Sequence, residues 1–179
     1  MGHSEGSLIG IMAGQVAELD AFVSIAGPGR SAAEVLREQL RPQLRENLWE
    51  HSERILTSLI EGRTAEQVPT ELTALYRPSV QPYLISWLPL NPAEEIKRLD
   101  APVLIVQGTT DIQVSVPDAH ALHAARADAE VAIIDGMNHL LKMVPADMAQ
   151  QQASYSNPAL PVSPQLIERV SAFLLTVAP

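Results

Sequence analysis

The sequence of 179 residues contains no cysteine. The chain therefore has no disulfide, no thiolate zinc ligand and no cysteine nucleophile, although this leaves its compartment open. No apolar run approaches the roughly 18 residues that a membrane helix needs, so we expect no membrane span. Basic residues are few, 12 against 21 acidic ones, and the formal charge of -9 opposes attraction to phosphate backbones. We expect no nucleic-acid partner.

Apolar residues are plentiful, at 46% of the chain, which suits one globular domain with a sizeable core. Residues 7–17 are small and apolar and predict a helix buried on both sides. Residues 21–26 predict a short strand that ends in a tight turn. Residues 31–62 and 64–76 predict helices. Residues 77–92 contain four prolines and several large apolar side chains, which favours a lid or pocket wall over a regular element.

The second half of the chain alternates between strands and helices. Residues 103–107 and 130–134 are apolar runs of the kind that form parallel strands covered on both faces. Residues 117–127 and 165–177 predict the helices that follow them. This alternation predicts an α/β fold with helical material inserted after the first strand.

One short motif places a serine where it can act as a nucleophile. Gly2-His3-Ser4-Glu5-Gly6 fits the G-x-S-x-G pattern, a strained turn from strand to helix that exposes the serine hydroxyl. We expect glycine at both flanking positions because side chains there would collide with neighbouring elements. We also expect the backbone N–H of Glu5 to point to where an oxyanion would form.

A serine nucleophile needs a base to accept its proton and an acid to orient that base. Asp111 lies four residues beyond the predicted strand 103–107, and His139 lies five beyond the strand 130–134. The order serine, aspartate, histidine, with the last two in loops after successive strands, predicts a catalytic triad of Ser4, Asp111 and His139.

Three segments resemble the active-site blocks of the α/β-hydrolase superfamily: Gly-His-Ser-Glu-Gly-Ser, Val-Leu-Ile-Val-Gln-Gly-Thr-Thr-Asp and Asp-Gly-Met-Asn-His. They look closest to bacterial esterases or serine-aminopeptidase-like members. The resemblance implies the C-terminal part of that fold, a mostly parallel sheet covered by helices, starting at the nucleophile elbow. It divides the chain into an elbow, helix and strand (1–30), a helical cap (31–92) and the core with the acid and base (93–179).

The same resemblance implies a serine hydrolase that cleaves carboxylic esters through an acyl-enzyme and needs no cofactor. The implied partner is a small-molecule ester or related acyl substrate, and Tyr83 and Trp87 are expected to line its pocket. Two alternatives stay open. A peptidase or thioesterase of the same fold would use the same triad, because only the pocket distinguishes these substrates. The chain could also be a catalytically silent fragment.

Each candidate residue also has an interpretation without catalysis. Ser4 suits a helix N-cap, and Asp111 suits a turn cap. Packing within the cap explains the large aromatic residues as well as a pocket does. His120 and His123 have helical spacing but no accompanying carboxylate or cysteine pattern, so we expect no metal site.

Only three residues precede Ser4, whereas the resemblance implies an elbow strand, earlier strands and a second oxyanion donor before it. We therefore expect a shortened reading frame or fragment with impaired activity. Strand 21–26 would then be a sheet edge, and a homodimer would pair its backbone N–H and C=O groups. We expect a cytoplasmic location, unless a signal peptide was lost with the missing part.

Overall fold

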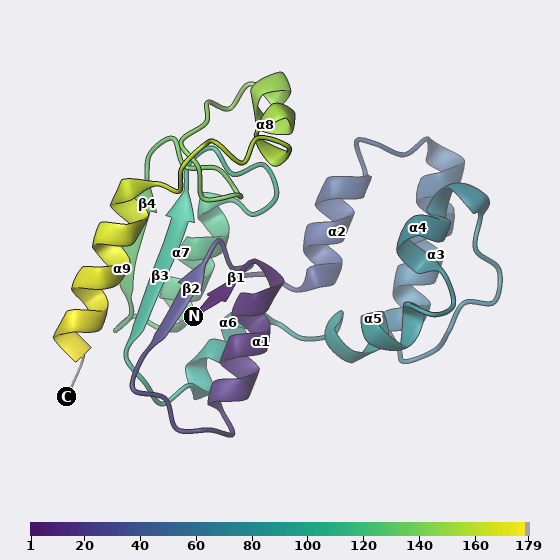
Figure 1. The fold of residues 1–179 in the computed structure, drawn as a ribbon. Coiled ribbons are helices and arrows are strands. Elements are labelled where there is room, and N and C mark those ends of the chain that lie inside the picture. Colours follow the sequence, from purple (N-terminus) through teal and green to yellow (C-terminus); the bar gives the residue numbers. More distant parts are fainter. Residues whose placement is uncertain (178–179) are drawn as a thin grey trace. The chain divides into compact units, whose positions relative to one another are not determined.

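The computed structural model describes residues 1–177, which form two compact units (Figure 1). The first unit combines Met1–Gly29 with the chain from Pro92 onward. The second unit is the intervening stretch, Arg30–Asn91. Among residues 1–177, no helix combines the length and the apolar character needed to cross a membrane.

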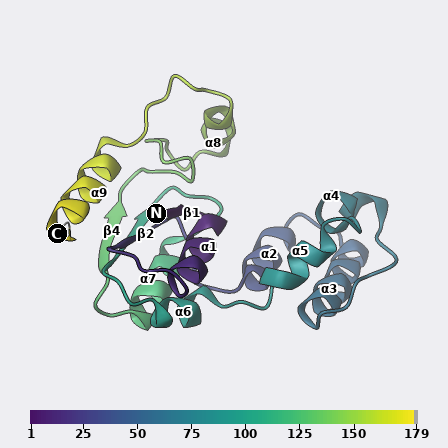
Figure 2. The same cartoon turned by 60° about the horizontal axis from the view of Figure 1, so that its bottom comes forward.

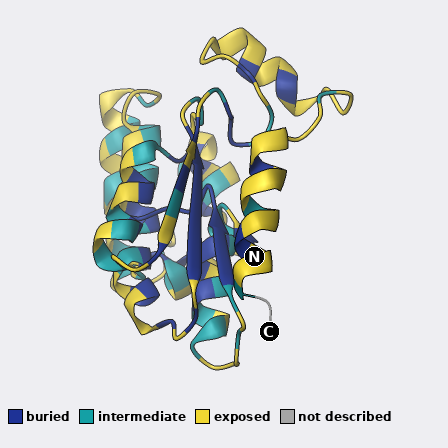
Figure 3. Ribbon diagram, turned by 90° about the vertical axis from the view of Figure 1, so that its left-hand side faces the viewer, coloured by how far each residue is buried: buried dark blue, intermediate teal, exposed yellow. Residues whose placement is uncertain are grey.

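The first unit contains a four-stranded sheet with the order β1-β2-β3-β4. Its strands are β1 (Gly2–His3), β2 (Phe22–Ile25), β3 (Val103–Gly108) and β4 (Glu130–Ile134). All neighbouring strands pair in parallel, and every residue of β3 is buried (Figure 3). The prediction of an α/β fold with a mostly parallel sheet is confirmed.

The prediction that strand 21–26 forms an edge of the sheet is wrong. The two residues of β1 pair with it, Gly2 beside Ser24 and His3 beside Ile25, so β1 is the terminal strand. Even two residues before the serine suffice to continue the ladder, because each contributes backbone hydrogen-bonding groups. The homodimer stays a prediction, and it loses the support of an open β2 edge.

Helices cover both faces of this sheet (Figures 1 and 3). On one face lie α1 (Glu5–Gly14), the short α6 (Pro92–Glu95) with the 3-10 turn η2 (Ile96–Arg98), and α7 (Val116–Ala125). The other face is covered by α9 (Pro164–Val177). β2 and β3 are buried throughout, because both of their faces pack against helices. The expectation that residues 130–134 are covered on both faces is wrong, because Glu130 and Ile133 of the edge strand β4 are exposed.

The core of this unit consequently has two layers. Successive strand residues point to opposite faces, so Phe22 belongs to one layer and Val23 to the other. The layer beneath α1, α6 and α7 contains Ile11, Phe22, Ile96, Leu99, Ala101, Val103, Ile105, Ala119, Leu122 and Ala129. The layer beneath α9 contains Val23, Ile25, Leu104, Val106, Ala132, Ile134, Met137, Leu166 and Phe173.

In the first unit, α1 and α8 differ from the sequence-based expectation. The helix expected over 7–17 is α1, which begins at Glu5 and ends at Gly14. It is not buried on both sides, because Ile11 is fully buried while Ile9 is 59% exposed. The helix α8 (Met148–Tyr155) was not predicted at all, since its Gln-rich sequence has little apolar periodicity.

The second unit is entirely helical (Figure 2). Its elements are α2 (Ala32–Leu40), α3 (Glu46–Ile60), η1 (Thr70–Leu72), α4 (Thr73–Tyr76) and α5 (Gln81–Trp87). The expectation of no regular element in 77–92 is wrong, because α5 lies within it. Pro82 occupies the first turn of this helix, where a proline displaces no intrahelical hydrogen bond.

Tyr76 is a buried polar anchor of the second unit. Its side chain is fully buried, its hydroxyl lies 2.8 Å from the Ser52 hydroxyl, and desolvation raises its pKa to about 12. The change Tyr76→Phe should destabilise the protein by about 1–3 kcal/mol, because the buried Ser52 hydroxyl loses its partner. Urea unfolding would measure this, with the exposed Tyr83→Phe as the control. Equal stability of the two variants would contradict the prediction.

Candidate active site

Ser4 occupies a strained turn between β1 and α1. Its φ of 56° and ψ of -128° lie in a backbone region that residues other than glycine rarely adopt. The Ser4 N–H donates to the Ile25 carbonyl at 2.9 Å, which ties the turn to the end of β2. The Ser4 side chain makes no capping hydrogen bond with α1. The side chain of Ser4 therefore does not act as a helix cap.

The two glycines of the motif have different roles. A Cβ atom on Gly2 would collide with the carbonyl group of Gly6, so the turn requires glycine at position 2. A Cβ atom on Gly6 would meet no atom of the described chain within 4 Å. The expectation that both glycines avoid a collision is correct for Gly2 and wrong for Gly6.

The structure brings the three predicted catalytic residues into one hydrogen-bonded row. The Nε2 atom of His139 lies 3.0 Å from the Ser4 hydroxyl, and its Nδ1 atom lies 2.8 Å from Asp111 Oδ2. The His139 side chain is 7% exposed and that of Asp111 is 0% exposed. The row forms because the elbow and the loops after β3 and β4 all follow the carboxyl ends of parallel strands.

The Asp111 carboxylate accepts four hydrogen bonds. Its Oδ1 atom accepts from the backbone N–H groups of Gln113 and Val114, at 2.8 and 3.0 Å. Its Oδ2 atom accepts from His139 and from the Nε2 group of Gln107, the latter at 3.1 Å. Turn capping and orientation of the histidine are therefore compatible, because each uses a different oxygen.

Gln107 is a site residue that the sequence analysis missed, because a glutamine inside an apolar run looks like an ordinary strand residue. It is fully buried at the end of β3. Its Nε2 group donates to Asp111 and, at 2.9 Å, to the Val114 carbonyl. These acceptors fix the amide orientation, and the amide in turn fixes the carboxylate.

We expect Gln107→Leu to lower the activity of the site by roughly ten-fold to a hundred-fold, because Asp111 loses a donor that orients it. Rates of serine labelling and thermal unfolding would be measured together, so that loss of position is distinguished from loss of fold. The exposed Gln150→Leu serves as the matched control. A Gln107→Leu protein with normal folding and normal labelling would show that the other partners of Asp111 suffice.

The loop that presents His139 is held from α8. Asn138 is buried, and its Oδ1 atom accepts from the backbone N–H groups of Leu140 and Lys142, both at 3.0 Å. Its Nδ2 group donates to the Ser154 hydroxyl at 3.0 Å. A helix that the sequence analysis did not predict thus anchors the loop of the candidate base.

Glu5 begins α1 and follows the candidate nucleophile. Backbone N–H groups in the first turn of a helix lack intrahelical partners, and the helix dipole makes this end favourable for negative charge. The Glu5 amide therefore suits the oxyanion role predicted for it. Desolvation raises the pKa of the Glu5 carboxyl.

The remaining predicted residues belong to other elements. Tyr83 and Trp87 belong to α5 of the second unit, with ring centroids 5.8 Å apart, and Tyr83 is 45% exposed. His120 and His123 lie in α7. Within residues 1–177, no three His, Asp or Glu side chains form a group that could hold a metal ion.

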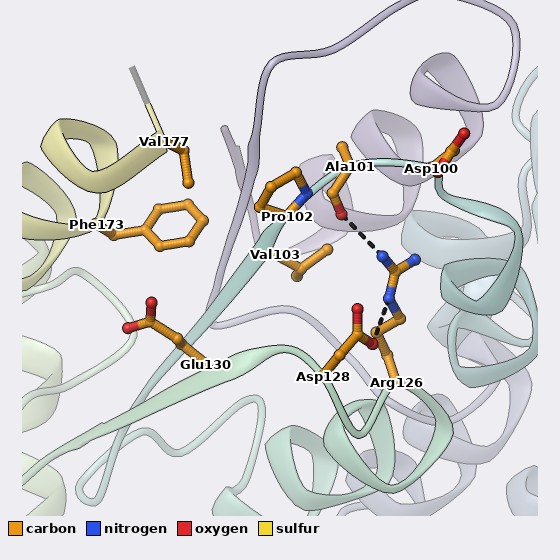
Figure 4. A pocket seen from close by; sticks show the side chains of 9 residues that line it. All are labelled: Asp100, Ala101, Pro102, Val103, Arg126, Asp128, Glu130, Phe173 and Val177. Atoms are coloured by element: carbon orange, nitrogen blue, oxygen red, sulfur yellow. Dashed lines mark hydrogen bonds and ion pairs between the residues drawn. The ribbon is translucent and has the colours of Figure 1, made fainter. Parts of the chain in front are cut away.

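A hollow of about 400 Å³ lies at the other end of the strands, where β3 and β4 begin (Figure 4). Arg126 lines it, together with Asp128 and Phe173. The Arg126 guanidinium donates to Asp128 at 2.7 Å and to the Ala101 carbonyl at 2.9 Å. Its donors therefore bind the protein itself, and the hollow is remote from the triad along the strands.

Comparison with known proteins bears on the fold of the chain. No protein-family model matches the chain. Esterase EstD of Thermotoga maritima is 27% identical to it over 144 residues, which cover 79% of this chain and 34% of EstD. The chain thus spans about a third of the length of this curated relative.

Two solved structures resemble the chain along nearly its whole length. One is the putative non-heme bromoperoxidase BpoC of Mycobacterium tuberculosis, with a TM-score of 0.52, 13% identity and coverage of 99% of this chain and 66% of BpoC. The other is a carboxylesterase structure from Nitrososphaera gargenis, with a TM-score of 0.52, 15% identity and coverage of 98% and 64%. These likenesses show that the chain has the α/β-hydrolase fold over part of that fold's extent.

Proposed function

We propose that this chain, which has the α/β-hydrolase fold, provides the catalytic triad of a serine hydrolase that cleaves carboxylic esters. The observation that supports this most directly is the row from Asp111 through His139 to Ser4, with hydrogen-bonding distances of 2.8 and 3.0 Å. The likeness to an esterase supports an ester as the substrate.

In the proposed mechanism, His139 Nε2 accepts the hydroxyl proton of Ser4 while the Ser4 oxygen attacks the ester carbonyl carbon. Asp111 stabilises the imidazolium that forms, and the Glu5 N–H stabilises the oxyanion. The imidazolium then gives its proton to the departing alkoxide, which leaves as an alcohol. The acyl group stays bound to the Ser4 oxygen. Water then attacks the acyl carbon while His139 accepts its proton. The bond between the acyl carbon and the Ser4 oxygen breaks, the imidazolium returns the proton to that oxygen, and the carboxylic acid leaves.

A fluorophosphonate probe tests the proposal, because it labels only a serine that a base has activated. We expect labelling of Ser4 in the intact chain and none in Ser4→Ala. Esters, thioesters and amides with a common acyl group would then define the reaction, and we expect esters to turn over fastest. An unlabelled Ser4 would identify a catalytically silent chain, whereas faster turnover of amides or thioesters would identify a peptidase or thioesterase.

We further propose that residues 31–92 act as a cap and that Tyr83 and Trp87 contact the acyl group. Their large side chains, close to each other on α5, support this role. Changing either residue to Ala should shift the preference among acyl chain lengths by roughly ten-fold. The acyl chain would lose apolar contacts, each about the size of a methylene group, that contribute to its binding. Rates for esters with two to twelve acyl carbons, about the range of common test substrates, would measure the shift. A uniform change across all esters would instead identify them as packing residues.

A further inference from the structure

His3, the residue before the candidate nucleophile, contacts the main chain of the candidate base. Its Nε2 atom lies 2.8 Å from the carbonyl oxygen of His139. A carbonyl oxygen only accepts hydrogen bonds, so the Nε2 atom of His3 bears the proton. The two imidazole rings also contact each other, with centroids 4.9 Å apart and planes inclined by 42°.

This contact joins parts of the site that the sheet itself does not join. His3 is the last residue of β1, and His139 follows β4, at the opposite end of the strand order. Two strands separate them, so no ladder of backbone hydrogen bonds joins β1 to β4 directly. The hydrogen bonds from Ser4 and from His3 to His139 connect the two directly.

The environment of His3 suits a neutral ring. Desolvation lowers its pKa, and the neighbouring His139 acts in the same direction, whereas the hydrogen bond to the His139 carbonyl and the charge of Asp111 oppose the shift. A neutral His3 keeps its Nε2–H for the carbonyl. It also adds no positive charge beside the imidazolium that His139 becomes during the proposed reaction.

We propose that His3 is a positioning residue, which holds the main-chain carbonyl of His139 and thereby keeps the imidazole within reach of the Ser4 hydroxyl. This inference rests on the proposed function and deepens it. In the sequence, His3 stands out only as the variable residue before the serine of the G-x-S-x-G motif. The structure gives it a different role, in which it acts on the base and not on the nucleophile.

Three variants separate the hydrogen bond from the ring contact. His3→Phe keeps a flat ring against His139 but removes the donor. His3→Gln restores an N–H donor of similar reach without the ring. His120→Phe makes the same exchange at an exposed position of α7, outside the site, and serves as the control.

Ester kinetics and the rate of fluorophosphonate labelling of Ser4 would be measured for each variant. We expect His3→Phe to lower kcat and the labelling rate by roughly ten-fold to a hundred-fold with little change in KM, because a displacement of about 1 Å has effects of this size. His3→Gln should recover most of the loss, and His120→Phe should behave as the wild type. A folded His3→Phe protein that reacts at the wild-type rate would overturn the proposal.

Imidazole NMR supplies a readout that does not need activity. We expect His3 to carry its proton on Nε2, and the proton between His139 and Asp111 to give a downfield signal that weakens in His3→Phe and returns in His3→Gln. An unlabelled wild-type Ser4 would overturn the proposed function, while this pattern of signals would still support positioning by His3. A signal that is unchanged in His3→Phe, or a proton on Nδ1 of His3, would overturn the positioning role.

Discussion

Replacing Ser4 or His139 by Ala is expected to lower kcat by about four to six orders of magnitude, because each change removes a group that forms or breaks a bond in the proposed reaction. Asp111→Asn should cost somewhat less. Its Oδ1 atom can still accept from the N–H groups of Gln113 and Val114, so the turn is kept while the oxygen that faces His139 is replaced. Steady-state ester kinetics of the three variants would measure these losses.

The Asp111→Asn variant is the informative one, because it separates the turn cap from the acid. Circular dichroism and thermal unfolding should match the wild type if the turn is intact. Near-full activity in such a folded variant would mean that another carboxylate orients His139, and that Asp111 serves the turn alone. The combined Ser4→Ala and His139→Ala protein should lose little beyond either single change, since residues that act as a unit are not additive.

Gly2→Ala is expected to lower the rate of Ser4 labelling by at least about a hundred-fold, whereas Gly6→Ala should leave it nearly unchanged. A Cβ atom on Gly2 would collide with the Gly6 carbonyl and displace the strained turn, and misplacements of about 1 Å have effects of this size. At Gly6 the methyl group meets no atom within 4 Å. Alanine there should even stabilise α1, by about 1 kcal/mol, as the better helix former.

The two glycine variants control for each other, because they make the same chemical change four residues apart in one motif. Labelling rates and melting temperatures would be measured in parallel. If Gly6→Ala impaired labelling as strongly as Gly2→Ala, the space beside Gly6 would have a function that the geometry of this chain does not reveal. Equal tolerance of both changes would contradict the tight turn at Ser4.

The sequence by itself determined the local features. Strand 130–134 appears at the predicted residues, because a short run of β-branched and apolar residues favours an extended backbone. The G-x-S-x-G pattern predicts the turn at Ser4 for a similarly local reason, since its backbone angles and the collision at Gly2 involve only neighbouring residues. Order along the chain then places Asp111 and His139 after successive strands.

Only the tertiary structure decided which groups meet. His139 lies 135 residues from Ser4 along the chain, and the link from His3 to its carbonyl spans 136. The support from α8 to the His139 loop likewise depends on packing that no periodicity encodes. Local patterns specify backbone conformation over a few residues, whereas these contacts depend on how the strands are ordered in the sheet, and so they emerge only when the chain is folded.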